Sequence, residues 1–221
     1  MTFLMPCQWK KLEPNTVQHY PARLSPNDEC FYARERMSHG GYGFSETNSL
    51  VDNFKMERSL QGEKRWYYRN QAVIIFAHEL ADLLESGMCI AAIPSSKKPD
   101  HPEYTSRYED LFTELQKLKT VIIETPITIS ESKQSSRMGG SRDIDEIYKN
   151  LVWLGFKKTT NHVILIDDVI TTGGHFKACQ RLILERCPGM RIIGAFWAKT
   201  IWPDRAITAN KNHKIQARSR T

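Results

Sequence analysis

The stretch of residues 163–175 constrains the fold of this chain more than any other. It reads Val-Ile-Leu-Ile-Asp-Asp-Val-Ile-Thr-Thr-Gly-Gly-His. Its four leading apolar residues predict a buried strand that ends at Asp167 and Asp168, and residues 176–186 have helical spacing. A strand, an acidic pair, a glycine-bearing turn and a helix together predict a ligand site at the carboxyl edge of a parallel sheet.

The loop after the acidic pair predicts a phosphate site. Backbone N–H groups of residues 171–175 would converge at the helix start, where unpaired donors and the positive end of the helix dipole coincide. The residues alone therefore indicate a sugar phosphate together with a metal. The alternative is the acidic strand end of a receiver-like or phosphatase-like sheet. A Walker A loop and a dinucleotide fingerprint are both absent from the sequence.

The stretch resembles the phosphoribosyl pyrophosphate (PRPP) signature of type I phosphoribosyltransferases. In that family the acidic pair hydrogen-bonds the ribose hydroxyls. The resemblance implies that Asp167 and Asp168 bind ribose at the catalytic centre. It also implies that the 5′-phosphate is surrounded by Thr171, Thr172, Gly173, Gly174 and His175. The family usually has Thr or Ser at the last of these positions, and the imidazole of His175 could also donate to phosphate.

Two more loops suit a polyanion. The first follows a strand predicted over residues 88–93 and offers hydroxyl, amide and ammonium groups. It resembles the pyrophosphate loop of the same family and consists of Ser95, Ser96, Lys97 and Lys98. The second, residues 130–142, is polar and has the length of a lid. In the resembled family a flexible loop at this position closes over PRPP, which gives that role to Lys133, Arg137 and Arg142.

Several aromatic and basic residues are candidates for contact with a nucleobase. In the resembled family a variable hood, often built from N-terminal residues, selects the base, and Tyr42, Phe44 and Trp66 could stack on a ring. Lys199 and Trp202 follow the last predicted strand, 190–198, and could contact the base at the same sheet edge as the signature. The alternative for each of these residues is ordinary packing or a solvated strand end.

The remaining pattern completes an α/β fold with a parallel sheet and helices on both faces. Helices are predicted over 70–86, 104–119 and 144–154, and one or two strands over 121–129. Within the N-terminal third, 30–36 could be a strand and 48–55 a strand or one helical turn. We expect three regions, namely an irregular N-terminal cap (1–70), a PRPP-binding core (71–202) and a basic, disordered tail (203–221).

Composition sets limits on the class of protein. The chain has 221 residues, of which 40% are hydrophobic and 25% charged, enough for one sizeable core. It has no run of 18 apolar residues, so no transmembrane helix is expected, and its start lacks the basic region of a signal peptide. The five cysteines are scattered, which predicts reduced thiols. We therefore expect a cytoplasmic protein without a membrane partner.

The net charge of +6 is concentrated in the tail. From residue 203 onward, five basic side chains against Asp204 alone give +4, so the rest of the chain carries only +2. The tail therefore predicts either a solvated disordered segment or a contact with nucleic acid.

The resemblance implies a reaction. The phosphoribosyl group of PRPP would be transferred to a nucleobase-like, nitrogenous acceptor with release of pyrophosphate and inversion at C1. Mg²⁺ would be bound through the pyrophosphate of PRPP. The loop pattern looks closest to competence-factor-like members. Thr171 stands roughly where 6-oxopurine enzymes of the family commonly have an Asp, which argues against hypoxanthine or guanine as the acceptor.

Two further function classes remain open at this stage. One is a PRPP- or nucleotide-sensing regulator that keeps the fold without turnover. The other is an effector in a nucleic-acid-containing complex, such as a defence or DNA-uptake system. A homodimer is compatible with the resemblance.

Overall fold

A six-stranded sheet forms the centre of the computed structural model, which describes residues 7–13, 20–133 and 143–203. The strand order is β1-β2-β8-β7-β3-β4. Five strands are parallel, namely β2 (Glu29–Met37), β8 (Arg191–Ile201), β7 (His162–Ile170), β3 (Cys89–Ala92) and β4 (Ile122–Glu124). The short β1 (Lys10–Lys11) joins antiparallel at the edge.

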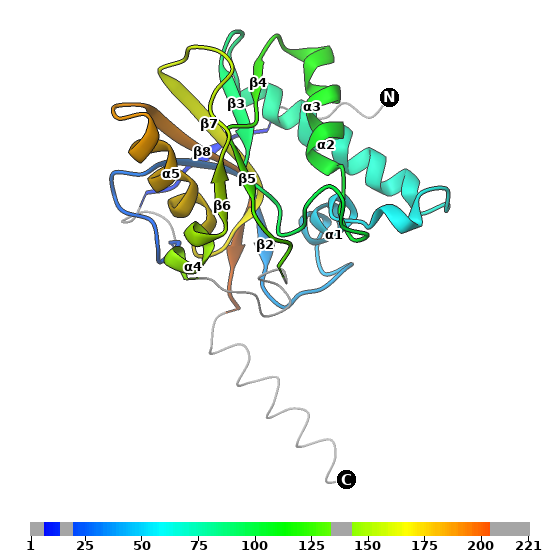
Figure 1. Ribbon diagram of the computed structural model, residues 1–221. Helices are drawn as coiled ribbons and strands as arrows, with labels where there is room; N and C mark the ends of the chain where they lie inside the picture. Colours follow the sequence, from blue (N-terminus) through cyan, green and yellow to red (C-terminus); the bar gives the residue numbers. More distant parts are fainter. Residues whose placement is uncertain (1–6, 14–19, 134–142, 204–221) are drawn as a thin grey trace.

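Helices cover both faces of this sheet (Figure 1). On one side lie α1 (Glu46–Phe54), α2 (Trp66–Leu83) and α3 (Arg107–Leu118), with a 3-10 turn η1 (Arg58–Leu60) between the first two. On the other side lie α5 (Gly174–Arg186) and the short α4 (Ile144–Lys149). The predicted fold class, α/β with a parallel sheet between helices, is confirmed.

Strand β7 is buried on both faces. Ile164 and Ile166 belong to the core cluster beneath α1–α3, whereas Val163 and Leu165 belong to the cluster beneath α5. Consecutive side chains of a strand point to opposite faces, so a strand covered on both sides has to be apolar at every position. This arrangement explains the unbroken apolar run at the start of the signature stretch.

The segment that we expected to form a cap contributes a strand to the central sheet. β2 pairs with β8 over its length, from Glu29↔Ile193 to Met37↔Ile201. The turn from β2 into α1 is fixed by Asn48, which is fully buried, accepts from Met37 N and donates to Met37 O and Gly41 O. Ser45 caps the helix by accepting from Asn48 N. Residues 48–55 therefore lie mostly in a helix.

The helix predicted over 144–154 is wrong in its second half. α4 ends at Lys149, and β6 (Leu151–Trp153) pairs antiparallel with β5 (Ile127–Ile129). The side chain of Asn150 causes the change, because it accepts from Ser130 Oγ and Glu131 N and donates to Glu131 O. Leu154, the last residue of the predicted helix, is 59% exposed.

The strand of the signature is also longer than predicted. The acidic pair does not end β7, which stays paired with β8 as far as Ile170↔Lys199. On its other side, the pairing with β3 ends at Ala92↔Ile166. Asp167 and Asp168 therefore lie just beyond the end of the β3 pairing. Among the described helices, none is both long and apolar enough to cross a membrane.

Candidate functional site

The acidic pair belongs to β7 and contacts residues at the end of α1 and at the start of α3. Asp168 is 3% exposed, and its Oδ1 lies 2.7 Å from Lys55 Nζ while its Oδ2 lies 3.3 Å from Arg107 Nε. Asp167 accepts a hydrogen bond at Oδ1 from the hydroxyl of Tyr108, at 2.7 Å, and another from the backbone N–H of Asp168. The Tyr108 hydroxyl itself accepts from Asp168 N at 3.1 Å.

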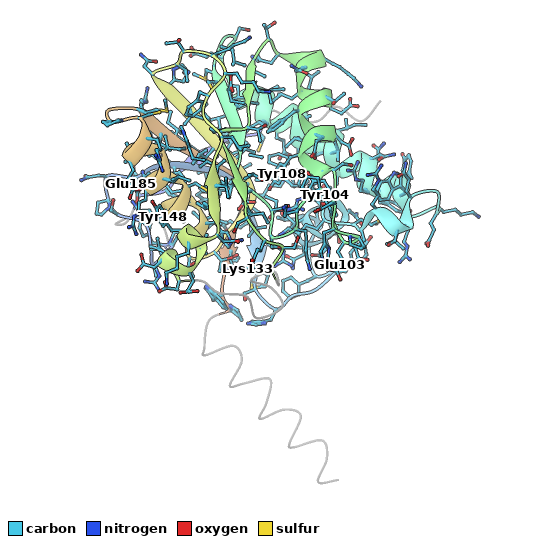
Figure 2. All side chains as sticks on the ribbon, viewed as in Figure 1. Glu103, Tyr104, Tyr108, Lys133, Tyr148 and Glu185 are labelled. Atoms are coloured by element: carbon cyan, nitrogen blue, oxygen red, sulfur yellow. The ribbon has the colours of Figure 1, made fainter. Side chains whose placement is uncertain are left out.

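Two helix ends bring these partners to the acidic pair. Lys55 follows the last residue of α1, and its N–H donates to Val51 O. Arg107 and Tyr108 form the first turn of α3, where Figure 2 shows Tyr104 and Tyr108 on the same side of the sheet. The helix predicted over residues 104–119 includes Arg107 and Tyr108, but nothing local in the sequence links either of them, or Lys55, to the signature.

The two carboxylates have opposite electrostatic character. Burial and then the charge of Asp168 raise the pKa of Asp167 to about 6. Burial acts in the same direction on Asp168, but the positive charges of Lys55 and Arg107 outweigh it and lower the pKa of that carboxyl. Asp168 is therefore the ionised member of the pair, and Asp167 binds a proton in weakly acidic solution.

Polar atoms around Asp168 remain without a hydrogen bond. Within the described ranges, Asp168 Oδ2, Arg107 Nε and Arg36 Nε are buried and have no hydrogen-bond partner. The ion pair between Asp168 Oδ2 and Arg107 Nε at 3.3 Å supplies charge without hydrogen-bond geometry. Buried polar groups are usually hydrogen-bonded, and exceptions need an explanation such as a missing ligand or water. A hydroxyl donor at Asp168 Oδ2 would satisfy that oxygen.

The Thr/Gly loop leads directly into α5. Gly173 has φ 83°, a left-handed conformation that favours glycine, and α5 begins at Gly174. The first helical bond runs from Lys177 N to Gly173 O, so the N–H groups at the start of α5 are not used within the helix. Thr171 lies beside β8, with its hydroxyl hydrogen-bonded to that of Thr200 at 2.8 Å.

An N-terminal segment holds this loop from outside. Arg23 N donates to Thr172 O at 2.8 Å, and a Cβ at Gly173 would lie 2.8 Å from Leu24 Cδ2. Asp28 anchors the segment to α5 through Lys177 Nζ, also at 2.8 Å. Thr172 and Gly173 are therefore fixed by tertiary contacts.

His175, the departure from the family pattern, lies in the first turn of α5. Burial lowers its pKa, although the charge of Asp168 acts against this. The imidazole is therefore neutral at pH 7, and it can donate from one ring nitrogen to a bound anion.

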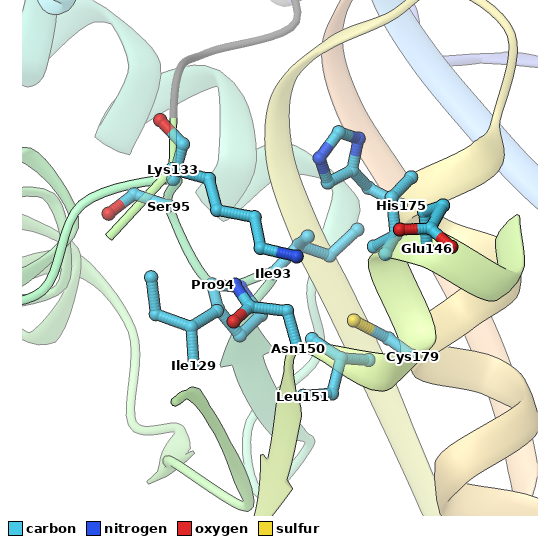
Figure 3. Close-up of a pocket in the computed structure, with 12 residues that line it drawn as sticks. Ile93, Pro94, Ser95, Ile129, Lys133, Glu146, Asn150, Leu151, His175 and Cys179 are labelled. Atoms are coloured by element: carbon cyan, nitrogen blue, oxygen red, sulfur yellow. The ribbon is translucent and has the colours of Figure 1, made fainter. Parts of the chain in front are cut away.

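The predicted pyrophosphate loop and the start of the predicted lid lie together. Lys133 N donates to Ser96 O at 2.8 Å, and Lys98 N donates to Ser132 Oγ at 3.0 Å. A cavity of about 60 Å³ between them is lined by Ser95, Ser96, Lys133 and His175, with Asn150 at its base. The Lys133 ammonium group points into this cavity (Figure 3), and Figure 2 shows the residue between the two helical layers. The structure thus brings three of the predicted anion-binding segments to one place.

Other predicted residues lie elsewhere. Lys97 pairs with Glu103 at 2.8 Å, and Arg137 and Arg142 lie outside the described residues. Lys199 is 1% exposed, with its Nζ 5.2 Å from the centre of the Tyr32 ring. Thr200 and not Lys199 faces the signature loop, because neighbours on a strand point to opposite faces. The base contact expected for Lys199 stays a prediction.

Exposed aromatic residues lie at the ends of β2 and β8. Trp202 is 39% exposed and lies 5.7 Å from the His39 ring, while Tyr42 and Phe44, in the loop before α1, are more than half exposed. They are accessible to a base, and their contact with one is likewise a prediction. Trp66 instead packs against Arg69 in α2.

The described residues contain no group of three or more His, Cys, Asp or Glu side chains that could hold a metal ion. Mg²⁺ fits this arrangement only when the ligand supplies most of its oxygen atoms, since it prefers few carboxylates together with substrate phosphates and water.

Comparisons with known proteins give a distant likeness. No protein-family model and no curated protein matches the chain. Two solved structures of a hypoxanthine phosphoribosyltransferase from Staphylococcus aureus are similar. The tetragonal form has 13% identity and a TM-score of 0.36, and covers 61% of this chain and 75% of that chain. The orthorhombic form has 14% identity and a TM-score of 0.31, and covers 62% and 76%. At such values the likeness carries no argument about substrate or activity.

Proposed function

We propose that this protein binds PRPP with Mg²⁺ and transfers the phosphoribosyl group to a nitrogenous acceptor, releasing pyrophosphate. One observation carries the proposal. A buried, ionised carboxylate with an unsatisfied oxygen, Asp168 Oδ2, lies on the same strand and loop that lead into the open helix start at Gly174. A ribose 5-phosphate offers a hydroxyl donor for the first group and a dianion for the second.

Each part of the site has a role in the proposed reaction. Asp168 accepts from a ribose hydroxyl, and its negative charge stabilises the positive charge that develops on the sugar as pyrophosphate departs. The N–H groups from Gly174 onward and the His175 imidazole hold the 5′-phosphate. Lys98 and Lys133 face the leaving pyrophosphate, whose charge Mg²⁺ neutralises when bound.

Ribose binding requires a rearrangement of the ion pairs at Asp168. Lys55 Nζ and Arg107 Nε now lie against its two oxygens, at 2.7 and 3.3 Å. Lys55 is the residue that can withdraw, because its side chain is 33% exposed, whereas that of Arg107 is 15% exposed. One sugar hydroxyl would then donate to Oδ1 in place of the ammonium group, and the neighbouring hydroxyl would donate to the unsatisfied Oδ2.

The same ion pairs favour a second candidate, a PRPP sensor without turnover. A carboxylate that has to exchange a cation for a sugar hydroxyl couples ligand binding to movement of α1, and such coupling is what a sensor needs. Both candidates require PRPP binding, and only the transferase releases pyrophosphate.

Calorimetry with PRPP and Mg²⁺ tests the proposal. Asp168→Asn should weaken PRPP binding by roughly ten- to a hundredfold, since it removes the charged acceptor of the ribose hydroxyl and hydrogen bonds to charged groups contribute about 1.5–3 kcal/mol. Glu85→Gln is the matched control, because Glu85 is exposed near the amino end of β3, at the opposite sheet edge, and the change also removes one negative charge. Equal PRPP affinities for the two variants would refute the ribose assignment.

Turnover is measured separately. The wild-type protein is incubated with PRPP, Mg²⁺ and a panel of bases, nucleotides and nucleic acids, and pyrophosphate and product masses are determined. PRPP binding with pyrophosphate release identifies a transferase. PRPP binding with no release for any acceptor identifies the sensor, and absence of PRPP binding refutes both.

A further inference from the structure

A second and larger cavity lies between α2, α3 and the 3-10 turn η1. Its volume is about 460 Å³, and its lining includes Arg58, Trp66, Arg69, Asp110 and Glu114. Small-molecule sites in proteins commonly measure about 300–1,000 Å³. The cavity is thus large enough for an organic ligand, and none of the groups assigned to PRPP lines it.

Arg69 is the central group of this cavity. The residue is 3% exposed, its Nη2 pairs with Asp110 Oδ2, and its guanidinium lies 4.8 Å from the centre of the Trp66 ring. Its Nε is buried and has no hydrogen-bond partner among the residues that the structure describes. A buried donor without an acceptor is costly, so a guanidinium edge beside an open cavity indicates a missing acceptor.

The charges of the lining favour an anion. Asp110 is neutralised by Arg69 and also accepts from Ser106 Oγ at 3.0 Å, and Glu114 pairs with Lys117 Nζ at 2.6 Å. Arg58 is exposed, and within residues 7–13, 20–133 and 143–203 it has no ion-pair partner. Because Glu114 is paired with Lys117, which lies outside the lining, the charge of Arg58 is left without an ion pair among the described residues, beside the unsatisfied Nε of Arg69.

The remaining lining suits a flat ring. Trp66 is partly exposed, and Val73 and Ile74 add apolar surface from the next turns of α2. A ring can pack on these side chains while its charged group lies beside the guanidinium groups.

We propose that this cavity binds a small organic anion in which a carboxylate or phosphate ester is attached to a flat ring. Arg58 and the Nε edge of Arg69 bind the anionic group, and Trp66, Val73 and Ile74 contact the ring. The site is separate from the acidic pair. Ser106 and Asp110 are spaced i, i+4 on the α3 face that borders the cavity, while Arg107 and Tyr108 turn toward β7.

Calorimetry on the full chain tests this site with four probes. Adenosine 5′-monophosphate and benzoate carry both a ring and an anionic group, adenosine carries only the ring, and inorganic phosphate only the charge. We expect at least one of the first two to bind with a stoichiometry of about one. Adenosine and phosphate should bind about tenfold more weakly or not at all, because each lacks one of the two contacts.

Two matched arginine variants locate the binding. Arg58→Gln should weaken the bound probe about tenfold, since it removes the positive charge of Arg58. Arg65→Gln is the control, because Arg65 is also exposed and close in sequence, but it pairs with Glu63 and does not line the cavity. Both positions are on the surface, so both variants should fold. Trp66→Leu should also weaken the probe by removing most of the ring surface.

The result of this test can be distinguished from the result of the PRPP binding test. Weakening by Arg58→Gln and not by Arg65→Gln, with PRPP affinity unchanged, supports the cavity as a second site. The inference is overturned if neither ring-bearing anion binds the wild-type protein, if Arg58→Gln leaves the affinity unchanged, or if the two arginine variants weaken it equally. Failure of PRPP to bind would refute the proposed function and leave this test unaffected.

Discussion

Replacement of Asp167 by Asn should stabilise the protein at neutral pH. The pKa of Asp167 is raised from 3.8 to about 6, first by burial and then by the charge of Asp168. Each pKa unit corresponds to 1.36 kcal/mol, so ionising this carboxyl in the folded state costs about 3 kcal/mol more than in the unfolded chain. An asparagine at this position carries no charge, and its side-chain oxygen can still accept from Tyr108 and from Asp168 N.

The sign of the pH dependence follows from the raised pKa. Because the folded protein holds the proton more tightly than the unfolded chain, the stability contributed by the protonated carboxyl is fully present below the unfolded pKa, near pH 4. It is lost as the pH rises through about 6. Asp168 behaves in the opposite way, since its lowered pKa gives stability that is present above the unfolded value and lost only in acid.

Urea unfolding at a series of pH values between about 4 and 7.5 measures this effect. The free energy of unfolding of the wild-type protein should fall relative to that of Asp167→Asn as the pH rises, and the variant should be more stable by up to about 3 kcal/mol at the upper end. Asp168→Asn is the control of opposite sign, because it leaves Lys55 and Arg107 without their carboxylate and should cost about 3–5 kcal/mol. Parallel curves for the wild-type protein and Asp167→Asn would refute the reasoning.

Three further predictions concern other parts of the chain. Gly173→Ala should destabilise more than Gly189→Ala in urea unfolding, because both have φ 83° but only the first places a Cβ 2.8 Å from a neighbouring side chain. Equal effects would contradict that account. Trp197→Phe removes the hydrogen bond from Nε1 to buried Glu79 Oε2 and should cost about 1–3 kcal/mol, so an unchanged urea midpoint would show that the bond contributes nothing. If the tail binds nucleic acid, the logarithm of the binding constant should fall with the logarithm of the salt concentration at a slope of about −3.5 to −4.5, and binding should vanish on deletion of residues 203–221. If the full-length protein binds neither DNA nor RNA at low salt, the prediction is wrong and the tail is only solvated.

The fold was predictable where the local pattern and the tertiary environment agree. The apolar run of β7 identifies a buried strand from the local sequence alone. The Thr/Gly loop likewise shows, without knowledge of tertiary contacts, that the strand ends before a helix. The helix predicted over residues 144–154 was wrong because the local pattern and the tertiary environment disagree there. Ile147, Leu151 and Leu154 have helical spacing, yet the side chain of Asn150 binds the backbone of the segment after β5 and starts a strand pair. Such a contact joins residues far apart in sequence and leaves no local signal.

Contacts between residues far apart in sequence also determine the chemistry of the candidate site, and the local sequence does not show them. In the signature Asp167 and Asp168 are equivalent neighbours, because both follow the same apolar run. The fold makes them unequal, since Lys55 at the end of α1 and Arg107 at the start of α3 both lie against Asp168, whereas Asp167 accepts from two neutral groups, the hydroxyl of Tyr108 and the backbone N–H of Asp168. The two cations keep Asp168 ionised, whereas the raised pKa of Asp167 allows that carboxyl to bind a proton in weakly acidic solution. In weakly acidic solution the pair therefore holds one proton, on Asp167, and keeps its negative charge on Asp168.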